Sequence, residues 1–591
     1  MSITLAESRG KNPPRPGNPP AILRAMLRPS VLWLAVPGLL YILAFLLLPC
    51  LRLLALSLVD DDTGAFSTSA YARLLHVGLY VRVLSTTFAV AFQVTALCLL
   101  LGYPLAYWLA RQPPRRQRML TLLVLFPFWT SALVKNFTWL VLLGRNGIVA
   151  NLLGALDLPA PDLLFSRATV VFGMTHTMLP LAIIGMLPVM NQIDRSLPAA
   201  ATTLGASRAQ AFWRVFFQLS MPGVASAGLL VFISSLGFFI TPALLGGPHD
   251  TLLGQLIIQQ IMTLQNWQLA GALASMLIAS VLVTCLVYNQ LFGLSAMAGG
   301  ATVKQRRGMI RRLGMAIAAG CAMLCDTAAR ALGPRSVDWL LPAYAWTLVL
   351  VLLLPILATI PMAFTSASFL SFPPPGLSLR WFANYATSDV WVDATFRSFG
   401  IGLASGLLTL LLAGPAAYAV ARGPARLGTV VFMLFVTPMV VPSIVIAVAL
   451  FYLFAQIGLV ATNLGIMIGH TVTGVPLAFV IMLAVLRGYD WRLDQAAATL
   501  GANRPRALWR VTLPLIKGGV AAAFIFAFLN SFEELTVALF VGGGLKTTLP
   551  RQMWDDVTLS VTPTLAAASV VVLLVVTSLF LLAEFLRQQQ R

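Results

Sequence analysis

Two stretches of this sequence match each other in register and decide how the chain is organised. The first runs from Asp194 to Val215 and reads DRSLPAAATTLGASRAQAFWRV. The second runs from Asp490 to Val511 and reads DWRLDQAAATLGANRPRALWRV, with 13 of 22 positions identical at an offset of 296 residues. Because the flanking residues continue this match more weakly, the repeat predicts two homologous halves in one chain.

Long apolar runs surround both stretches. Of the 591 residues, 59% are hydrophobic and 10% are charged, and the mean hydropathy is +0.88, more apolar surface than a soluble core can bury. The runs are continuous, which is typical of membrane-spanning helices. A β-barrel would instead have short segments of alternating hydrophobicity, so this fold is excluded. We therefore expect an all-α polytopic membrane protein with about 12 transmembrane helices, arranged as two parallel six-helix repeats. The expected spans are 32–58, 84–110, 119–143, 168–190, 221–245 and 268–293 in the first half, and 339–363, 396–422, 428–456, 465–486, 517–542 and 562–586 in the second.

The net charge is +20, and the positions of the basic residues indicate how the chain is oriented in the membrane. Basic residues gather before the first expected span and after even-numbered ones, for example Arg111, Arg115 and Arg116. Under the positive-inside rule this places these loops and both termini on the cytoplasmic side. We therefore expect no nucleic-acid partner.

The apolar segment Gly314–Ala331 would invert every later loop if it crossed the membrane, so we assign it to a cytoplasmic linker. Within it we expect Met309–Ala331 to form a helix on the membrane surface. The expected division is a basic tail (1–30), a first half (31–293, core 84–293), the linker (294–338) and a second half (339–591, core 396–586).

The strongest similarity lies in a cytoplasmic loop between the fourth and fifth spans of each half, where sequence usually drifts unless a partner binds. The Ala-rich segments Leu197–Thr203 and Leu493–Thr499 predict short helices. Gly205 and Gly501 can adopt the positive φ that ends such a helix. Two short helices set at an angle would fit a partner's groove; the alternative is an ordinary helix–turn–helix connector.

These loops resemble the EAA coupling loop of binding-protein-dependent ABC importer permeases. The similarity rests on AAATTLGA (199–206) and QAAATLGA (495–502), and in that family the loop docks on a separate ATPase subunit. Ala199 and Gln495 replace the family's Glu, while the glycine and apolar positions are kept. The residues to which the resemblance assigns ATPase coupling are Ala200, Ala201, Leu204, Gly205, Ala206, Ala496, Ala497, Leu500, Gly501 and Ala502.

Further motifs are similar to spermidine/putrescine-type permeases. GYPLA (102–106) and PFWTS (127–131) resemble the first permease subunit of such systems; SFPPPG (371–376), SFEE (531–534) and LPRQMW (549–554) resemble the second. The resemblance implies inward alternating-access transport of a small cation such as a polyamine across a bacterial-type inner membrane. Ferric iron, thiamine and an aminophosphonate are the other cargoes considered.

The implied partners are an extracytoplasmic solute-binding protein, two ATPase subunits per chain and the lipid bilayer. This chain is expected to be a transport component and not an enzyme, with no cofactor of its own and with ATP and Mg on the partner ATPase. The nearest approach to a Walker A loop, GGGLKT (542–547), has Leu where that motif has Gly. A proton- or sodium-coupled secondary carrier with two six-span halves is the competing class, and ATP dependence separates the two.

Three residues are candidates for the substrate path: Glu533, Glu534 and Trp129. The two glutamates fall in the fifth expected span of the second half, where an ionisable group costs about 2.5–3.5 kcal/mol on insertion scales. A carboxylate there could contact a cationic substrate, or it could instead be satisfied by a neighbouring helix through a residue such as Lys135. Trp129 could stack on an ammonium group, with ordinary helix packing as the alternative.

The remaining polar residues indicate no other chemistry. His176 and His470 do not align with each other under the repeat, and we interpret both as hydrogen-bonded packing residues. Cys321 and Cys325 have helical spacing, but no His or acidic cluster accompanies them, so we expect no metal site.

Overall fold

The computed structural model describes residues 31–292, 319–327 and 334–588, apart from positions 61, 62, 146, 155, 158, 160, 161 and 321. The basic tail 1–30 and most of the linker 294–338 lie outside the described residues. Throughout the described part the elements are helices, with two isolated β-bridges. Within it, ten helices are long and apolar enough to cross a membrane, and two bent helix pairs raise the number to twelve. The predicted all-α polytopic fold is therefore confirmed.

The first half opens with one continuous span, Val31–Leu56, which includes α2 (Val36–Ile42) and α3 (Leu48–Leu56). The elements that follow are α4 (Ser69–His76), α5 (Gly78–Ala110), α6 (Pro114–Trp129), α7 (Ala132–Leu142), α8 (Ile148–Gly154), α9 (Arg167–Asn191), α10 (Ser196–Thr203), α11 (Arg208–Ala211), α12 (Phe217–Leu236), α13 (Ile240–Leu245), α14 (Leu253–Met262) and α15 (Trp267–Phe292).

The second half repeats this order. Its elements are α17 (Pro334–Ala363), α18 (Arg380–Thr387), α19 (Asp389–Arg422), α20 (Ala425–Val440), α21 (Ser443–Ile457), α22 (Asn463–Arg487), α23 (Arg492–Thr499), α24 (Arg504–Ala507), α25 (Leu513–Phe532), α26 (Thr536–Val541), α27 (Leu549–Leu559) and α28 (Pro563–Gln588).

The third span of each half is broken, which corrects the prediction of single helices over 119–143 and 428–456. Helices α6 and α7 meet at 85°, and α20 and α21 meet at 94°. In the second half Pro442 follows the break and disfavours helical backbone at Val441, which is extended. In the first half the Ser131 hydroxyl accepts a hydrogen bond from the Leu133 amide at 3.2 Å and so caps the new helix.

The fifth spans begin and end earlier than predicted. They run over Arg208–Leu236 and Arg504–Phe532, beginning inside the repeated stretch, and a short helix, α13 or α26, follows each after a break. The predicted ranges 221–245 and 517–542 merged the span with this short helix, because both parts are apolar.

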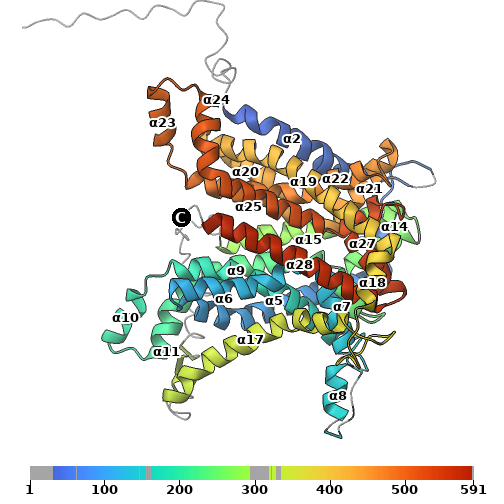
Figure 1. The fold of residues 1–591 in the computed structure, drawn as a ribbon, viewed down its shortest axis with the longest axis horizontal. Coiled ribbons are helices and arrows are strands. Elements are labelled where there is room, and N and C mark those ends of the chain that lie inside the picture. Colours follow the sequence, from blue (N-terminus) through green and yellow to red (C-terminus); the bar gives the residue numbers. More distant parts are fainter. Residues whose placement is uncertain are drawn as a thin grey trace, which may run out of the picture.

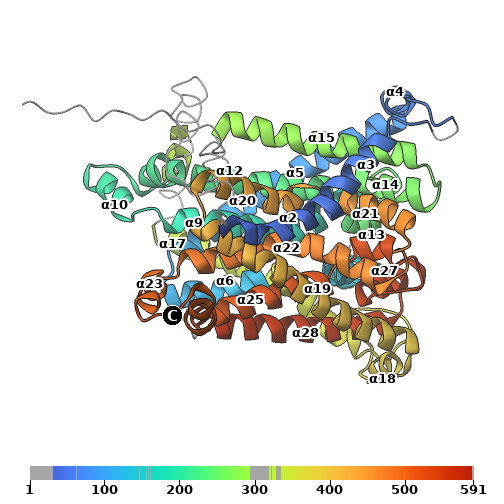
Figure 2. The same ribbon diagram turned by 90° about the horizontal axis from the view of Figure 1, so that it is seen from above.

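The first helix of each half packs on the other half. The span Val31–Leu56 contacts α19, α20 and α21, while α17 contacts α5, α6 and α7. Each of these first helices also makes a hydrogen bond to the other half through a tyrosine. The Tyr41 hydroxyl donates to the Ile468 carbonyl and the Tyr344 hydroxyl donates to the Leu101 carbonyl, both at 2.7 Å. Figure 2 shows α2 lying over α20 and α22. The two halves are therefore interlocked.

The repeated loops lie at one end of the molecule. Helices α10 and α11 and helices α23 and α24 protrude from the same end, which also holds the C-terminal end of α28 (Figure 1). The Arg195 guanidinium donates to the Ala110 carbonyl at 2.8 Å, so the C-terminal end of α5 reaches the first loop. The Arg422 guanidinium, at the C-terminal end of α19, lies 3.6 Å from the Asp494 carboxylate of the second loop. The arginines near the C-terminal ends of α5 and α19 therefore lie at this loop-bearing end.

Candidate coupling loops and transport pathway

The two coupling loops, residues 194–215 and 490–511, have nearly the same backbone. Gly205 has φ +91° and Gly501 has φ +85°, as the sequence predicted. The amides of Gly205 and Ala206 donate to the Thr202 and Ala201 carbonyls, both at 3.1 Å. The equivalent amides of the second loop make the same two bonds, at 3.0 Å each. This Schellman arrangement ends α10 and α23 and turns the chain sharply.

The tip of each loop presents one leucine to its surroundings. Leu204 and Leu500 are both 88% exposed. A Cβ at Gly205 or Gly501 would meet no atom within 4 Å, so nothing in the described chain covers either tip. The alanines alternate in the same way in both loops: Ala200 and Ala496 are exposed, and the other predicted alanines are partly buried. Each loop tip is therefore open to contact with another protein chain.

A buried carboxylate anchors the second loop. Asp494 is 8% exposed and accepts hydrogen bonds from the Tyr489 hydroxyl at 2.9 Å and the Thr512 hydroxyl at 3.0 Å. The Arg422 guanidinium at the end of α19 lies 3.6 Å from its other oxygen. Burial raises the pKa of the Tyr489 phenol to about 12, and the bond to Asp494 acts in the same direction, so this donor stays protonated at neutral pH. Asp494 was not among the residues predicted from the sequence, although its carboxylate stands out on an Ala-rich helix.

Glu533 and Glu534 lie at the break between α25 and α26, beyond the last helical residue of the fifth span. The Glu534 carboxylate accepts hydrogen bonds from the amides of Thr536 at 3.0 Å and Val537 at 2.8 Å. It therefore caps the N-terminus of α26, where backbone N–H groups and the helix dipole favour negative charge. Glu534 thus has a structural role at the start of α26.

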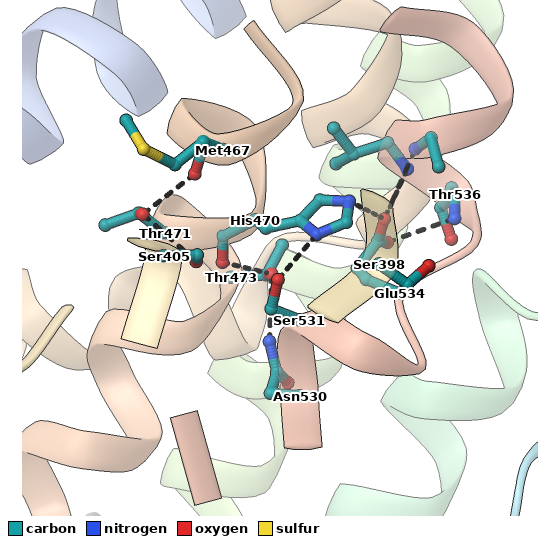
Figure 3. Close-up of polar contacts among 12 residues, drawn as sticks. Ser398, Ser405, Met467, His470, Thr471, Thr473, Asn530, Ser531, Glu534 and Thr536 are labelled. Carbon is teal, nitrogen blue, oxygen red and sulfur yellow. Dashed lines mark hydrogen bonds and ion pairs between the residues drawn. The ribbon is translucent and has the colours of Figure 1, made fainter. Parts of the chain in front are cut away.

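A polar cluster from α22 and α25 surrounds Glu534 (Figure 3). His470 is 1% exposed; its Nδ1 shares a hydrogen bond of 2.8 Å with the Ser531 hydroxyl. Its Nε2 lies 3.4 Å from the Glu534 carboxylate. The Asn530 side chain donates to the Thr473 hydroxyl at 3.1 Å in the same cluster. His470 is thus a hydrogen-bonded packing residue, as interpreted from the sequence, but its closeness to Glu534 could not be found from spacing.

Glu533 has no such partner. Its Oε1 is buried and makes no hydrogen bond within the described chain, although the residue as a whole is partly exposed. It interacts electrostatically with Lys135 of the first half, a side chain that is 2% exposed and donates to the Pro127 carbonyl at 2.8 Å. No ion pair within 4.0 Å joins these two side chains in the described structure. The Glu533 carboxyl group therefore has a cationic residue in its surroundings but no ion pair within the described structure.

The repeat explains where Glu533 points. The equivalent first-half residue is Gly237, and a Cβ there would lie 2.8 Å from the Cβ of Pro442, at the break of the second half's third span. The corresponding break in the first half ends at Ser131, and the electrostatic interaction of Glu533 with Lys135 of α7 agrees with a position of Glu533 near that break. Glu533 thus lies where the two halves meet.

The other two aromatic and imidazole candidates pack against the opposite half. The Trp129 ring packs against the Phe526 ring of α25 in a tilted arrangement with ring centroids 4.7 Å apart, as in the packing alternative considered from the sequence. The His176 imidazole lies 3.2 Å from the Val351 carbonyl of α17. Within the described residues, no group of three or more His, Cys, Asp or Glu residues could hold a metal ion.

One known protein family matches both halves of the chain. Residues 102–296 and 410–591, more than half of the chain, match the family described as "Binding-protein-dependent transport system inner membrane component". The chain belongs to this family. Both matched segments of the permease contain a coupling loop.

Among the permease's relatives, the spermidine/putrescine transport system permease protein PotB of Salmonella typhimurium is 30% identical over 256 residues, 42% of this chain and 88% of PotB. PotC of Haemophilus influenzae is 26% identical over 214 residues, 36% of this chain and 83% of PotC. The probable ABC transporter permease protein y4fN of Sinorhizobium fredii is 26% identical over 449 residues, 74% of each chain. Among solved structures, a bacterial alginate ABC transporter in complex with an alginate pentasaccharide-bound periplasmic protein is 19% identical, with a TM-score of 0.37, covering 46% of this chain and 93% of its own.

Proposed function

We propose that this permease imports a small organic cation, such as a polyamine, driven by ATP hydrolysis on separate subunits. Its general role as a multi-pass inner-membrane transport component follows from the family. The cargo is inferred from Glu533, a carboxylate between the two halves whose Oε1 lacks a hydrogen-bond partner in the described chain. A cationic substrate would supply that partner, and relatives named for spermidine and putrescine support this choice.

The conformational change powered by ATP hydrolysis would reach the permease through the coupling loops. Each loop offers an exposed leucine on a fixed turn, and the two loops lie at the same end of the molecule (Figure 1). Two ATPase subunits, one per loop, would therefore fit one chain, with ATP and Mg bound on those subunits. Closure of the ATPase pair would push the loops together and reverse which side of the half–half interface is open.

The orientation follows from charge. The arginines after α5 and α19 share the loop-bearing end, which the positive-inside rule assigns to the cytoplasm. Both termini would then be cytoplasmic, and an extracytoplasmic solute-binding protein would deliver the cargo at the opposite end.

The first test is co-purification of the permease from membranes with a co-expressed ATPase and binding protein, followed by ATPase assays in proteoliposomes. We expect spermidine or putrescine to stimulate hydrolysis, and ferric iron and thiamine not to. Stimulation by another solute would support the ATP-driven mechanism and refute the polyamine assignment. Uptake that follows a proton gradient without any associated ATPase would refute the mechanism and favour a secondary carrier.

Glu533→Gln tests the cargo site, with Glu534→Gln as the matched control. Of the two glutamates, only Glu533 receives no hydrogen bond from a donor in the described chain. Glu533→Gln should therefore raise the KM for polyamine uptake while the complex still assembles. Glu534→Gln should leave that KM unchanged. Normal uptake in both variants would exclude this pair from the path.

A further inference from the structure

The linker between the halves touches the first coupling loop. Its described residues 322–327 form a helical segment, here called the linker helix. The Ser207 hydroxyl donates to the Asp326 carboxylate at 2.6 Å, and the Trp213 indole N–H donates to the Cys325 sulfur at 3.4 Å. Ala322 is only 1% exposed, so the helix packs against the protein and is more than a nearby tether.

The repeat supplies a control for this contact, because Ser207 and Trp213 correspond to Asn503 and Trp509. Trp509 is 71% exposed and Asn503 is also exposed, whereas their first-half equivalents are partly buried. The two loops have the same backbone turn but different surroundings. Within the described residues, one flank of the first loop is covered and the equivalent flank of the second loop is exposed.

The two loops also differ in their internal anchors. Asp494 fixes the second loop to its own half through two hydroxyl donors and Arg422. At the positions of Asp494, Tyr489 and Thr512 the first loop has Pro198, Ile193 and Phe216, which carry no polar side chain. The carboxylate anchor of the second loop therefore has no counterpart inside the first.

We propose that the linker helix is an intramolecular partner of the first coupling loop, with Asp326 supplying from the linker the carboxylate anchor that Asp494 supplies in the second loop. Ser207 is well suited to bind the Asp326 carboxylate. Its hydroxyl oxygen accepts from the Gln210 amide at 3.1 Å and caps α11, while the hydroxyl proton remains available for Asp326. The linker thereby positions the helix that leads from the loop into the membrane. Movement of an ATPase against the first loop would then depend on the linker, and movement against the second would not.

The contact itself is tested by disulfide trapping, which does not depend on the proposed function. In a Cys325→Ala background, Ser207→Cys with Asp326→Cys should form a cross-link on oxidation of native membranes, detected by peptide mass spectrometry. The matched pair, Asn503→Cys with Asp326→Cys, should form none. Absence of the first cross-link, or equal yield from both pairs, would overturn the proposal.

The positioning role is tested in the reconstituted complex and rests on the loops being ATPase docking sites. Asp326→Ala should lower substrate-stimulated ATPase activity about tenfold, the order expected for loss of a hydrogen bond to a charged group. The double-cysteine variant should have low ATPase activity when reduced. Oxidation should restore the activity, because the disulfide replaces the lost hydrogen bond between the linker helix and the loop.

The outcomes separate the two hypotheses. A cross-link with full activity in Asp326→Ala would overturn the anchoring role. If no ATPase associates even with the unaltered permease, the proposed function fails, while the cross-link still reports the linker contact.

Discussion

Replacing the glycine at the turn of one coupling loop should uncouple the permease without unfolding it. In Gly501→Val the new Cβ would meet no atom within 4 Å, so no steric clash contributes. The penalty is conformational: φ is +85°, and a residue with a Cβ loses about 1–2 kcal/mol in left-handed backbone. That penalty lowers the equilibrium constant between the docking-competent turn and its alternatives by about 5- to 30-fold.

The assay is ATPase activity stimulated by substrate and binding protein, expressed per ATPase that co-purifies with the permease. We expect Gly501→Val to lose about fivefold or more of that stimulation, while the purified chain remains folded and still unfolds in a cooperative thermal transition. Gly501→Asn is the matched control, because Asn tolerates the left-handed region better than other residues. Gly205→Val and Gly205→Asn repeat the comparison at φ +91°.

The result that would refute this reasoning is equal activity of the Val and Asn variants. Equal losses would mean that any side chain at the turn blocks docking, so the backbone conformation would not be the cause. Equal retention would mean that the turn does not transmit movement.

Four further predictions follow from the contacts. Leu500→Asp should abolish co-purification of the ATPase at an unchanged melting temperature, because the side chain is 88% exposed; normal co-purification would place docking elsewhere. Asp494→Ala should lower the melting temperature, since it removes the acceptor of two hydroxyl donors, at about 1–3 kcal/mol for each group left unsatisfied, whereas the exposed Asp194→Ala should not. Glu534→Gln should also lower the melting temperature, by weakening a charged helix cap worth about 0.3–2 kcal/mol, and an unchanged value would argue against capping. Tyr41→Phe should destabilise the exchanged first helix by about 1 kcal/mol in chemical denaturation, and no change would show that packing alone holds it.

Local features of the sequence predicted the backbone turn of the repeated loops. The positive φ of Gly205 and Gly501 follows from the need to end a short Ala-rich helix, a property of a few neighbouring residues. The number of apolar segments likewise follows from hydropathy alone. Such features need no knowledge of what packs against the segment.

Features that depend on distant contacts were missed. Apolar composition continues through the breaks after Trp129 and Val440, so hydropathy could not separate two bent helices from one straight span. The roles of Glu533 and Glu534 were indistinguishable in sequence, because only the fold shows that one of them meets the amides of α26. The contact between Ser207 and Asp326 spans 119 residues and could not be derived from either segment.

The exchange of first helices constrains how the molecule can be made. The span Val31–Leu56 is synthesised long before α19, against which it finally packs, so it must wait in the bilayer without its partner. Its composition suits that wait: its most apolar window has a mean hydropathy of 2.5 and stays only 22% buried after assembly, against 72% for Arg167–Asn191. Lipid can therefore solvate it almost as well before assembly as after.

Joining the halves in one polypeptide has a kinetic benefit for the same reason. The waiting helix meets its binding surface at an effective concentration set by the linker, without a search for a separate subunit through the membrane. Biogenesis of this permease would then be a first-order process, with a yield independent of how much of the chain the cell makes.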